Sequence, residues 1–184
     1  MKNITFLGDS LTAGYGLPNP ATQSVPALIQ QKIRDKNLEY QVFNGGMSGS
    51  TSGNALYRLD HWLKRPVDVF VLQIGINDLI RKTPVELTAK NMEDIFRKVT
   101  GKYPECKLGL LGMRLPKTTS SSVVASFNGI YPALAEKLNL AYIPFYLEGV
   151  AGRRELNLPD GLHPNASGYS VIADRIWPVI KTLL

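Results

Sequence analysis

Cysteine is almost absent from this chain, which contains a single one, Cys106. One thiol cannot form a disulfide within the chain, so the fold is expected not to depend on oxidation. Cys106 follows a Lys-Tyr-Pro-Glu segment and lies far in sequence from both histidines. We therefore interpret it as a structural or surface cysteine and not as a nucleophile.

Long apolar stretches are also missing. No apolar run approaches the roughly 20 residues needed to span a bilayer, so no integral membrane segment is expected. The first residues, Met1 to Asn3, lead directly into an apolar run without an export signal. On the sequence as given we expect a cytoplasmic protein, or a periplasmic or secreted one if a leader has been removed.

A run of basic residues with interleaved aromatics does not occur, although the formal net charge is +6. Lysine and arginine are scattered, and their tightest groups are the adjacent pairs at 64–65, 81–82 and 153–154. This distribution favours a solvated surface and indicates no nucleic-acid partner. A modest attraction to anionic lipid or to acyl carriers stays open as the alternative.

What the chain does contain is an alternation of short apolar runs and longer amphipathic segments. Hydrophobic residues make up 44% and charged residues 20% of its 184 residues, which suits one globular domain over residues 1–184. Strands are predicted at 4–7, 40–44, 67–74, 107–113 and 141–145, and helices at 24–37, 52–64, 83–102, 123–138 and 165–182. The alternation predicts the α/β class, with five parallel strands in a three-layer α/β/α sandwich.

Two of the predicted helices carry starting signals. Ser24 is expected to be an N-cap, with Pro26 in the first turn. Thr83 is expected to be an N-cap with Pro84 at the first helical position and Glu86 completing a capping box.

Polar residues and glycines follow the predicted strands at the points where the strands end. In chain order these loops carry Asp9 with Ser10, residues 45–53, Asn77 with Asp78, Arg114, and Asp160 with His163. Ligands of parallel α/β sheets bind outside the carboxyl ends of the strands. The sequence therefore predicts a functional site at this rim of the sheet.

Ser10 is the candidate nucleophile, because a serine hydroxyl becomes reactive when a base takes its proton. His61 lies within a predicted helix and is interpreted as a surface residue, which leaves His163 as the base. Asp160 precedes His163 by three residues, with Gly161 between them allowing a tight turn. Its carboxylate could orient the imidazole or simply cap the turn, and the spacing alone favours neither.

Acyl transfer also needs hydrogen-bond donors for the oxyanion that develops on the substrate. The candidates are the backbone N–H groups of Ser10 and Gly49 and the side-chain amide of Asn77. Taken singly, Gly49 and Asn77 are more readily interpreted as turn residues. Their occurrence at successive strand ends together with Ser10 and His163 favours the catalytic interpretation.

Four segments resemble the conserved blocks of the SGNH hydrolases, also called GDSL esterases and lipases. Residues 8–12 (Gly-Asp-Ser-Leu-Thr) resemble the first block, Gly49 the second, residues 75–78 (Gly-Ile-Asn-Asp) the third and residues 160–164 (Asp-Gly-Leu-His-Pro) the fifth. The resemblance spans essentially the whole chain in the right order. Residues 113–116 and 130–132 further resemble the branch of bacterial acyl-CoA thioesterases, lysophospholipases and arylesterases.

The resemblance implies a flavodoxin-like sheet and a Ser-His-Asp triad without metal or cofactor. It also implies hydrolysis of esters or thioesters through an acyl-enzyme. Val25 departs from that branch, whose members often have an aromatic residue at this position, and the departure concerns substrate preference. The missing export signal is a second departure, which concerns localisation.

We therefore predict a serine esterase or thioesterase with Ser10, His163 and Asp160 as catalytic residues and a small-molecule acyl ester or thioester as substrate. The sequence indicates no oligomeric state. Apolar or charged rim residues that could contact the substrate are Leu11, Ile76, Arg114, Leu115, Pro116 and Leu162. Two alternatives are a carbohydrate O-acetyl esterase and a non-catalytic flavodoxin-like module that binds a phosphate or a flavin.

Overall fold

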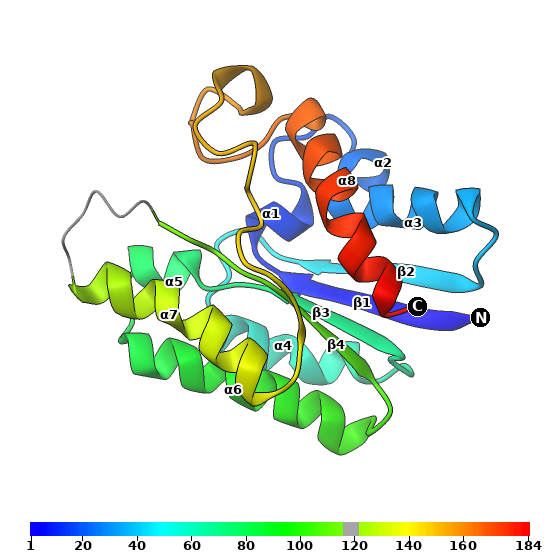
Figure 1. The fold of residues 1–184 in the computed structure, drawn as a ribbon, viewed down its shortest axis with the longest axis horizontal. Helices are drawn as coiled ribbons and strands as arrows, with labels where there is room; N and C mark the ends of the chain where they lie inside the picture. Colours follow the sequence, from blue (N-terminus) through cyan, green and yellow to red (C-terminus); the bar gives the residue numbers. More distant parts are fainter. Residues whose placement is uncertain (116–121) are drawn as a thin grey trace.

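A computed structural model describes residues 1–115 and 122–184 of the chain. Its centre is a parallel sheet in the order β2-β1-β3-β4-β5 (Figure 1). The strands are β1 (Lys2–Gly8), β2 (Tyr40–Gly46), β3 (Val69–Gln73), β4 (Lys107–Leu111) and β5 (Ala141–Ile143). This is the flavodoxin-like strand order, so the predicted fold class is confirmed.

Helices cover both faces of the sheet. On one face α3 (Val25–Asp35) packs against α8 (Ala166–Thr182), and on the other α6 (Val85–Lys102) packs against α4 (Ser52–Trp62) and α7 (Ser122–Lys137). The spacing of apolar residues explains how α6 is oriented. Its buried residues include Met92, Ile95, Phe96 and Val99, which recur at the helical interval and form one apolar stripe against the sheet.

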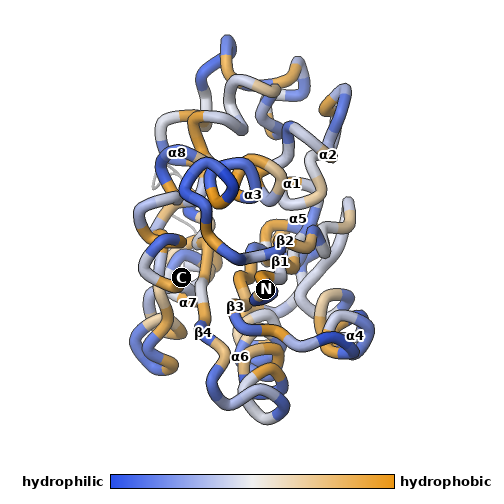
Figure 2. Tube along the Cα trace, turned by 90° about the vertical axis from the view of Figure 1, so that its right-hand side faces the viewer, coloured by the Kyte–Doolittle hydropathy of each residue, from blue (hydrophilic) through white to orange (hydrophobic). Residues whose placement is uncertain are grey.

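The core lies between the sheet and the two helical layers. Every residue of β3 is buried, which explains why Val69 to Leu72 form a continuous apolar run and not an alternating one; the strand ends in the buried polar residue Gln73. Figure 2 shows the hydrophobic stretches of the strands at the centre of the molecule. Each aliphatic side chain buried there contributes about 1.5–3 kcal/mol to stability.

The register of the central strands produces the rim. Gly8 at the end of β1 pairs with Gly46 of β2 and with Gln73 of β3. Three adjacent strands therefore end at nearly the same level, and the loops that follow them emerge side by side. No helix within the described residues is long and apolar enough to cross a membrane.

Two predicted helix starts differ from the structure in their capping. The prediction of a capping box at Thr83 is wrong, because α6 begins at Val85 and its N-cap is Pro84 without a side-chain cap bond. Pro84 has an extended backbone (φ −52°, ψ 136°), so helical geometry begins only after it. Ser24 is the N-cap of α3 as predicted, but its hydroxyl accepts a bond from Asn44 Nδ2 (3.4 Å) instead of capping the helix.

Four short helices were not predicted from the sequence. They lie in segments that were expected to be loops or strand ends: α1 (Ser10–Ala13), α2 (Pro20–Gln23), α5 (Ile76–Ile80) and the 3₁₀ turn η1 (Arg154–Leu156). Helices of about one turn are too short to show an apolar period, so pattern reasoning has nothing to detect. Two of them, α1 and α5, carry candidate site residues.

Candidate active site

Ser10 is the first residue of α1, directly beyond the end of β1. Asp9 is the N-cap of this helix, and its Oδ1 accepts a hydrogen bond from the Leu11 N–H (2.9 Å). Gly8 must be glycine for packing reasons, because a Cβ there would lie 2.0 Å from Thr12 Oγ1 and 2.5 Å from the Gln73 carbonyl oxygen. The turn is therefore tight, and it presents Ser10 at the rim with 9% of its surface exposed.

Asp9 itself faces the interior and is fully buried. Gln73 Nε2 donates to Asp9 Oδ2 (3.3 Å), and Thr12 Oγ1 donates to Gln73 Oε1 (2.8 Å). Desolvation by burial raises the pKa of Asp9 to about 6, against hydrogen bonds from Leu11 and Gln73 that lower it. Asp9 thus supports the turn that presents Ser10, and it is too deeply placed to meet a substrate.

The loop after β5 brings Asp160 and His163 to the same rim. Asp160 Oδ1 accepts hydrogen bonds from the backbone N–H groups of Leu162 (2.9 Å) and His163 (3.0 Å). Asp160 Oδ2 lies 2.7 Å from His163 Nδ1. Gly161 between them has φ +69°, in the left-handed region that favours glycine. The two interpretations of Asp160 that the spacing left open are thus both observed, since one oxygen caps the turn and the other binds the imidazole.

These contacts also fix the charge of Asp160. The backbone hydrogen bond from His163, followed by the bond to its ring and the bond from Leu162, lowers the pKa of Asp160 to about 2. The carboxylate is therefore ionised at neutral pH, as a group that stabilises an imidazolium must be.

His163 connects this loop to the serine. Its Nε2 lies 2.9 Å from Ser10 Oγ, across 153 residues of sequence. With the Nδ1 proton directed at Asp160, Nε2 is free to accept the proton of the hydroxyl. The ring of Tyr15 packs on the imidazole, with centroids 4.6 Å apart and planes inclined by 47°. Tyr15 was not among the predicted site residues, because a tyrosine in a Gly-Tyr-Gly loop carries no pattern that connects it to a distant histidine.

The other residues considered for nucleophilic chemistry lie elsewhere. His61 is exposed on α4, with its ring edge-on to Trp62. Cys106 is buried, and desolvation by burial raises the pKa of its thiol to about 12. A thiol with so high a pKa is inert at neutral pH, which agrees with the structural interpretation.

The three candidate oxyanion donors differ in what they already bind. Within residues 1–115 and 122–184, the backbone N–H groups of Ser10 and Gly49 have no hydrogen-bond acceptor. The Asn77 amide donates one of its two hydrogens to the Ser50 carbonyl oxygen (Nδ2···O 3.0 Å), which leaves the second available. Gly49 has φ +75°, a left-handed conformation that explains the need for glycine.

Three further residues hold the loop that contains Gly49, and the sequence analysis did not assign them this role. Arg81 Nη2 donates to the Gly49 carbonyl oxygen (3.0 Å). Arg58, from α4, donates to the carbonyl oxygens of Gly45 (3.2 Å) and Gly8 (3.3 Å) and to the Ser50 hydroxyl (3.2 Å). Arg58 lies in a predicted helix and Arg81 in a predicted loop, and both are interpreted from the sequence as solvated surface charges, so only the tertiary structure reveals these bonds.

Asp78 is the third of these residues and is almost fully buried. Its side chain accepts bonds from the backbone N–H of Ser52 (Oδ2···N 2.7 Å) and from the Ser52 hydroxyl. It thereby joins α5 to the start of α4.

The predicted substrate-contacting residues are not equally accessible. Leu11 is 4% exposed and belongs to the hydrophobic core, so it cannot line an open groove. Ile76 and Leu115 are half-buried, and Leu162 beside His163 is 63% exposed. Leu115 is further fixed by Asn128, which binds both its N–H (2.9 Å) and its carbonyl oxygen (3.1 Å).

The predicted residues Arg114 and Pro116 follow β4. Arg114 is exposed, and its guanidinium lies 5.7 Å from the ring centroid of Phe145, a cation–π arrangement. Pro116 lies outside the described residues.

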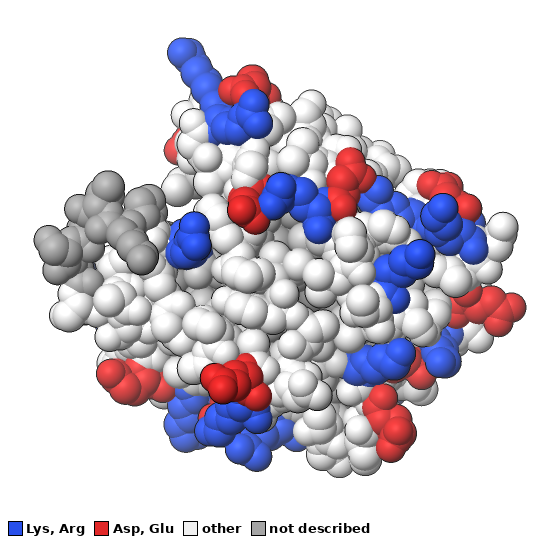
Figure 3. All heavy atoms as spheres, in the orientation of Figure 1, with Lys and Arg blue, Asp and Glu red and all other residues white. Residues whose placement is uncertain are grey.

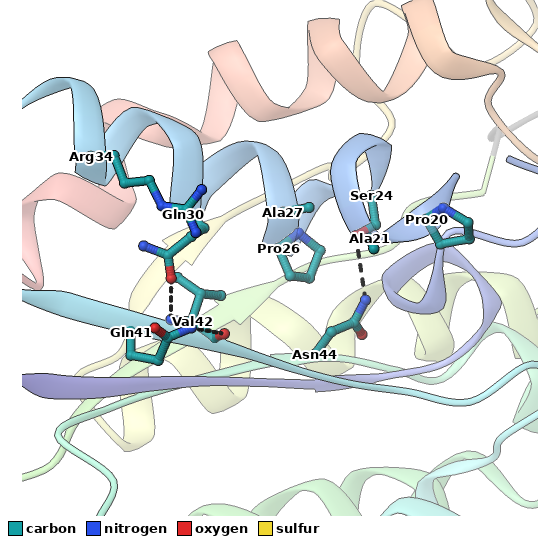
Figure 4. Close-up of a pocket in the computed structure, with 10 residues that line it drawn as sticks. All are labelled: Pro20, Ala21, Ser24, Pro26, Ala27, Gln30, Arg34, Gln41, Val42 and Asn44. Carbon is teal, nitrogen blue, oxygen red and sulfur yellow. Dashed lines mark hydrogen bonds between the residues drawn. The ribbon is translucent and has the colours of Figure 1, made fainter. Parts of the chain in front are cut away.

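Two surface hollows differ in their distance from the candidate catalytic residues along the chain. One of about 260 Å³ lies between α2, α3 and β2 and contains none of the candidate catalytic residues (Figure 4). Gln30 closes part of it by binding the carbonyl of Tyr40 and the N–H of Val42, which satisfies the open edge of β2. The other hollow, of about 480 Å³, is formed by the loop that carries Asp160, with Arg153, Arg154 and Leu158 among its lining residues.

Charges on the visible face of the molecule are mixed. Figure 3 shows lysines and arginines next to aspartates and glutamates over this face, with no continuous basic patch. Ion pairs between side chains of opposite charge include Arg175–Glu148 and Arg153–Glu155 (3.0 Å).

Comparisons with known proteins support the same interpretation of the site as its geometry does. Residues 6–171 match the GDSL-like Lipase/Acylhydrolase family. The esterase TesA of Pseudomonas aeruginosa is 31% identical over 185 residues, covering 100% of this chain and 90% of that protein. The thioesterase 1/protease 1/lysophospholipase L1 of Escherichia coli K12 is 33% identical over 182 residues, covering 98% of this chain and 84% of that protein.

A solved structure agrees with these relatives. The crystal structure of TesA superimposes with a TM-score of 0.91 at 30% sequence identity, and the match covers 100% of both chains. The similarity therefore extends over the whole sheet and its rim.

Proposed function

Because the chain belongs to the GDSL-like lipase and acylhydrolase family and is a hydrolase of ester bonds, we propose that Ser10, His163 and Asp160 are its catalytic triad. The observation that carries this proposal is the unbroken chain of contacts from Ser10 Oγ to His163 Nε2 (2.9 Å) and from His163 Nδ1 to Asp160 Oδ2 (2.7 Å). These are the distances at which a base can take a hydroxyl proton while a carboxylate orients it.

In the first half of the reaction, Ser10 Oγ attacks the carbonyl carbon of the ester or thioester while His163 Nε2 takes the hydroxyl proton. The tetrahedral intermediate collapses when His163 returns this proton to the departing alcohol or thiol, and an acyl-enzyme remains on Ser10. In the second half, His163 takes a proton from water as the water attacks the acyl carbon, and it then returns this proton to Ser10 Oγ as the intermediate collapses, which releases the acid and regenerates Ser10. Asp160 stays ionised throughout and stabilises the imidazolium.

The negative charge of each tetrahedral intermediate would be held by the N–H groups of Ser10 and Gly49 and by the second amide hydrogen of Asn77. What supports this assignment is that these donors come from the loops after β1, β2 and β3, whose ends are level in the sheet. Removing one such donor typically slows catalysis by about 10²–10³-fold.

The substrate class follows from the rim and the relatives together. Leu162 is exposed directly beside the base, and Ile76 lies beside Asn77, so the surroundings of the site are suited to an acyl chain. The relatives are named an esterase and a thioesterase/lysophospholipase, which are enzymes of acyl esters and thioesters.

A hydrolysis panel tests the proposal. It sets p-nitrophenyl esters of graded chain length beside acyl-CoAs, lysophospholipids and acetylated sugars, and it compares wild type with Ser10→Ala and His163→Ala. We expect turnover of acyl esters or thioesters that falls by at least about 10³-fold in both variants. His61→Ala is the matched control and should retain wild-type rates, because this histidine lies on the surface of α4.

Two outcomes would overturn the proposal. Full turnover by Ser10→Ala would show that another group performs the chemistry, and turnover confined to acetylated sugars would replace the acyl-chain substrate by a carbohydrate ester.

A further inference from the structure

The backbone of the segment from Gly49 to Ser52 makes three hydrogen bonds with the short helix α5 and its C-cap, while Arg58 and Asn91 bind the hydroxyls of Ser50 and Ser52. Three successive attachments come from residues of α5 or its C-cap: Arg81 to the Gly49 carbonyl, Asn77 to the Ser50 carbonyl and Asp78 to the Ser52 N–H. Building on the proposed function, we propose that Arg81 is a positioning residue. By holding the Gly49 carbonyl oxygen, it restrains the backbone of Gly49 so that the N–H of this residue faces the oxyanion.

The Ser50 N–H binds the Met47 carbonyl oxygen (3.1 Å) and closes a turn around Gly49, and the bond from Arg81 adds a restraint from outside this turn. A Cβ placed on Gly49 would meet just one atom within 4 Å among the described residues, Arg81 Nη2 at 3.4 Å, so side-chain packing does not fix this residue. A glycine in the left-handed region can also reach other conformations at little cost. The direction of the Gly49 N–H is then set by the hydrogen bonds to nearby backbone groups, among them the carbonyl oxygens of Gly49 and Ser50.

The bond from Arg81 is well suited to this role. A guanidinium donates charge-assisted hydrogen bonds, which are roughly twice as strong as neutral ones. The 3.0 Å bond joins it to the carbonyl of the same residue whose N–H is the proposed donor. Loss of the bond would free the backbone of Gly49, and a displacement of about 1 Å at a reacting group can slow catalysis by about 10²-fold.

Arg81 is also the attachment that can be removed most cleanly. Asn77 is itself a proposed oxyanion donor, and Asp78 is 1% exposed and joins two helices, so changes at either would have several effects. Arg81 is exposed, and its side chain has no other hydrogen bond or ion pair in the described part of the chain.

An exposed guanidinium next to the reaction centre could instead bind an anionic group of the substrate, and the two roles have different kinetic signatures. A positioning residue lowers kcat for every substrate, including neutral ones, and leaves KM nearly unchanged. An anion-binding residue raises KM for anionic substrates and spares neutral ones.

The test measures kcat and KM of Arg81→Met with neutral p-nitrophenyl butyrate and with anionic acyl-CoA. Lys82→Met is the matched control, because it removes an equal charge from the adjacent exposed residue. We expect kcat to fall by about 10–100-fold in Arg81→Met for both substrates, with KM changed by less than about threefold. The rate of inactivation by a neutral fluorophosphonate should fall in parallel. Arg81→Lys, which keeps a cationic donor, should recover part of kcat, and Lys82→Met should match wild type.

Several other results would contradict a positioning role for Arg81. An unchanged kcat in folded Arg81→Met overturns it, and so does an equal loss in Lys82→Met, which would indicate a general effect of charge. A defect limited to KM for acyl-CoA assigns Arg81 to anion binding instead. If Arg81→Met fails to fold, Arg81→Gln replaces it, and an unchanged kcat in that variant contradicts the role. A wild-type protein that hydrolyses none of the substrates overturns the proposed function itself, which is distinguishable from an active enzyme that tolerates the loss of Arg81.

Discussion

Replacing Asp9 with asparagine should stabilise the protein at neutral pH and leave its stability nearly unchanged in acid. Asp9 is fully buried and receives hydrogen bonds from Leu11 and Gln73, but these do not compensate for the water that its charge loses. Asparagine resembles the protonated carboxyl group in shape. Its Oδ1 can keep the bond from the Leu11 N–H, and its NH₂ can donate to Gln73 if that amide turns over and donates in turn to Thr12.

The magnitude follows from the pKa of Asp9, which burial raises from 3.8 to about 6. A raised pKa means that the folded state binds the proton more tightly than the unfolded state, so the contribution of Asp9 is fully present below about pH 4 and is lost as the pH rises through 6. The difference of about 2.2 pKa units corresponds to about 3 kcal/mol at about 1.36 kcal/mol per unit. The loss should be below about 1 kcal/mol at pH 4, about 2 kcal/mol at pH 5 and about 3 kcal/mol at pH 7 and above.

The assay is urea unfolding of wild type and Asp9→Asn at constant ionic strength between pH 4 and pH 8. The difference in unfolding free energy between the two proteins isolates the contribution of Asp9, because all other titrating groups are common to both. It should increase in favour of the variant by about 2–3 kcal/mol from pH 4 to pH 7 and then stay level. Asp60→Asn, at an exposed aspartate that pairs with Lys98, is the control and should differ from wild type by less than about 0.5 kcal/mol at every pH.

A difference that does not vary with pH would refute the reasoning, because it would mean that Asp9 has the same proton affinity in both states. A variant that is less stable than wild type at pH 7 would refute it as well. That result would show that the charge of Asp9 is needed to hold the turn before Ser10.

Two other predictions concern the loops of the rim. Asp160→Asn should lower kcat by about 10²–10⁴-fold, because a neutral amide cannot stabilise the imidazolium of His163; steady-state kinetics with an activated ester measures this. Since the pKa of Asp160 is about 2, its ionisation should produce no limb in the wild-type pH–rate profile above about pH 4. Gly46→Ala should destabilise the protein by about 1–3 kcal/mol or more and slow turnover, because the new Cβ would lie 2.1 Å from the backbone nitrogen of Ala13 in α1. Gly101→Ala is its control. Apart from its chain neighbours and its own helix backbone, no atom of the described residues lies within 4 Å of the new Cβ, and the residue is helical, so thermal or urea unfolding should show a stability gain of about 0.5–1 kcal/mol.

The fold could be predicted from the sequence because its signals are long. The β3 run from Val69 to Gln73 and the apolar stripe of α6 each repeat a pattern often enough to be recognised. Helix starts were less predictable, as Thr83 shows. A capping box depends on the backbone angles of two residues, and Pro84 adopts an extended conformation that moves the start of α6 to Val85.

The candidate site was predictable where topology alone brings residues together. Ser10 follows β1 and His163 lies in the loop after β5, and a parallel sheet places both at its carboxyl edge regardless of the distance in sequence. Residues that act through a neighbour leave no such signal. Arg58 and Arg81 read as surface charges, and their bonds to backbone carbonyls exist only because two loops meet in space.

The most direct test of the central claim is the site of covalent labelling by a fluorophosphonate probe. The protein is incubated with the probe, its intact mass is measured, and the modified peptide is identified after digestion. The account predicts one added phosphonyl group on Ser10, formed rapidly in wild type, slowly in His163→Ala and not at all in Ser10→Ala. Labelling that persists in Ser10→Ala, or that maps to another serine, would contradict the assignment of Ser10 as the nucleophile.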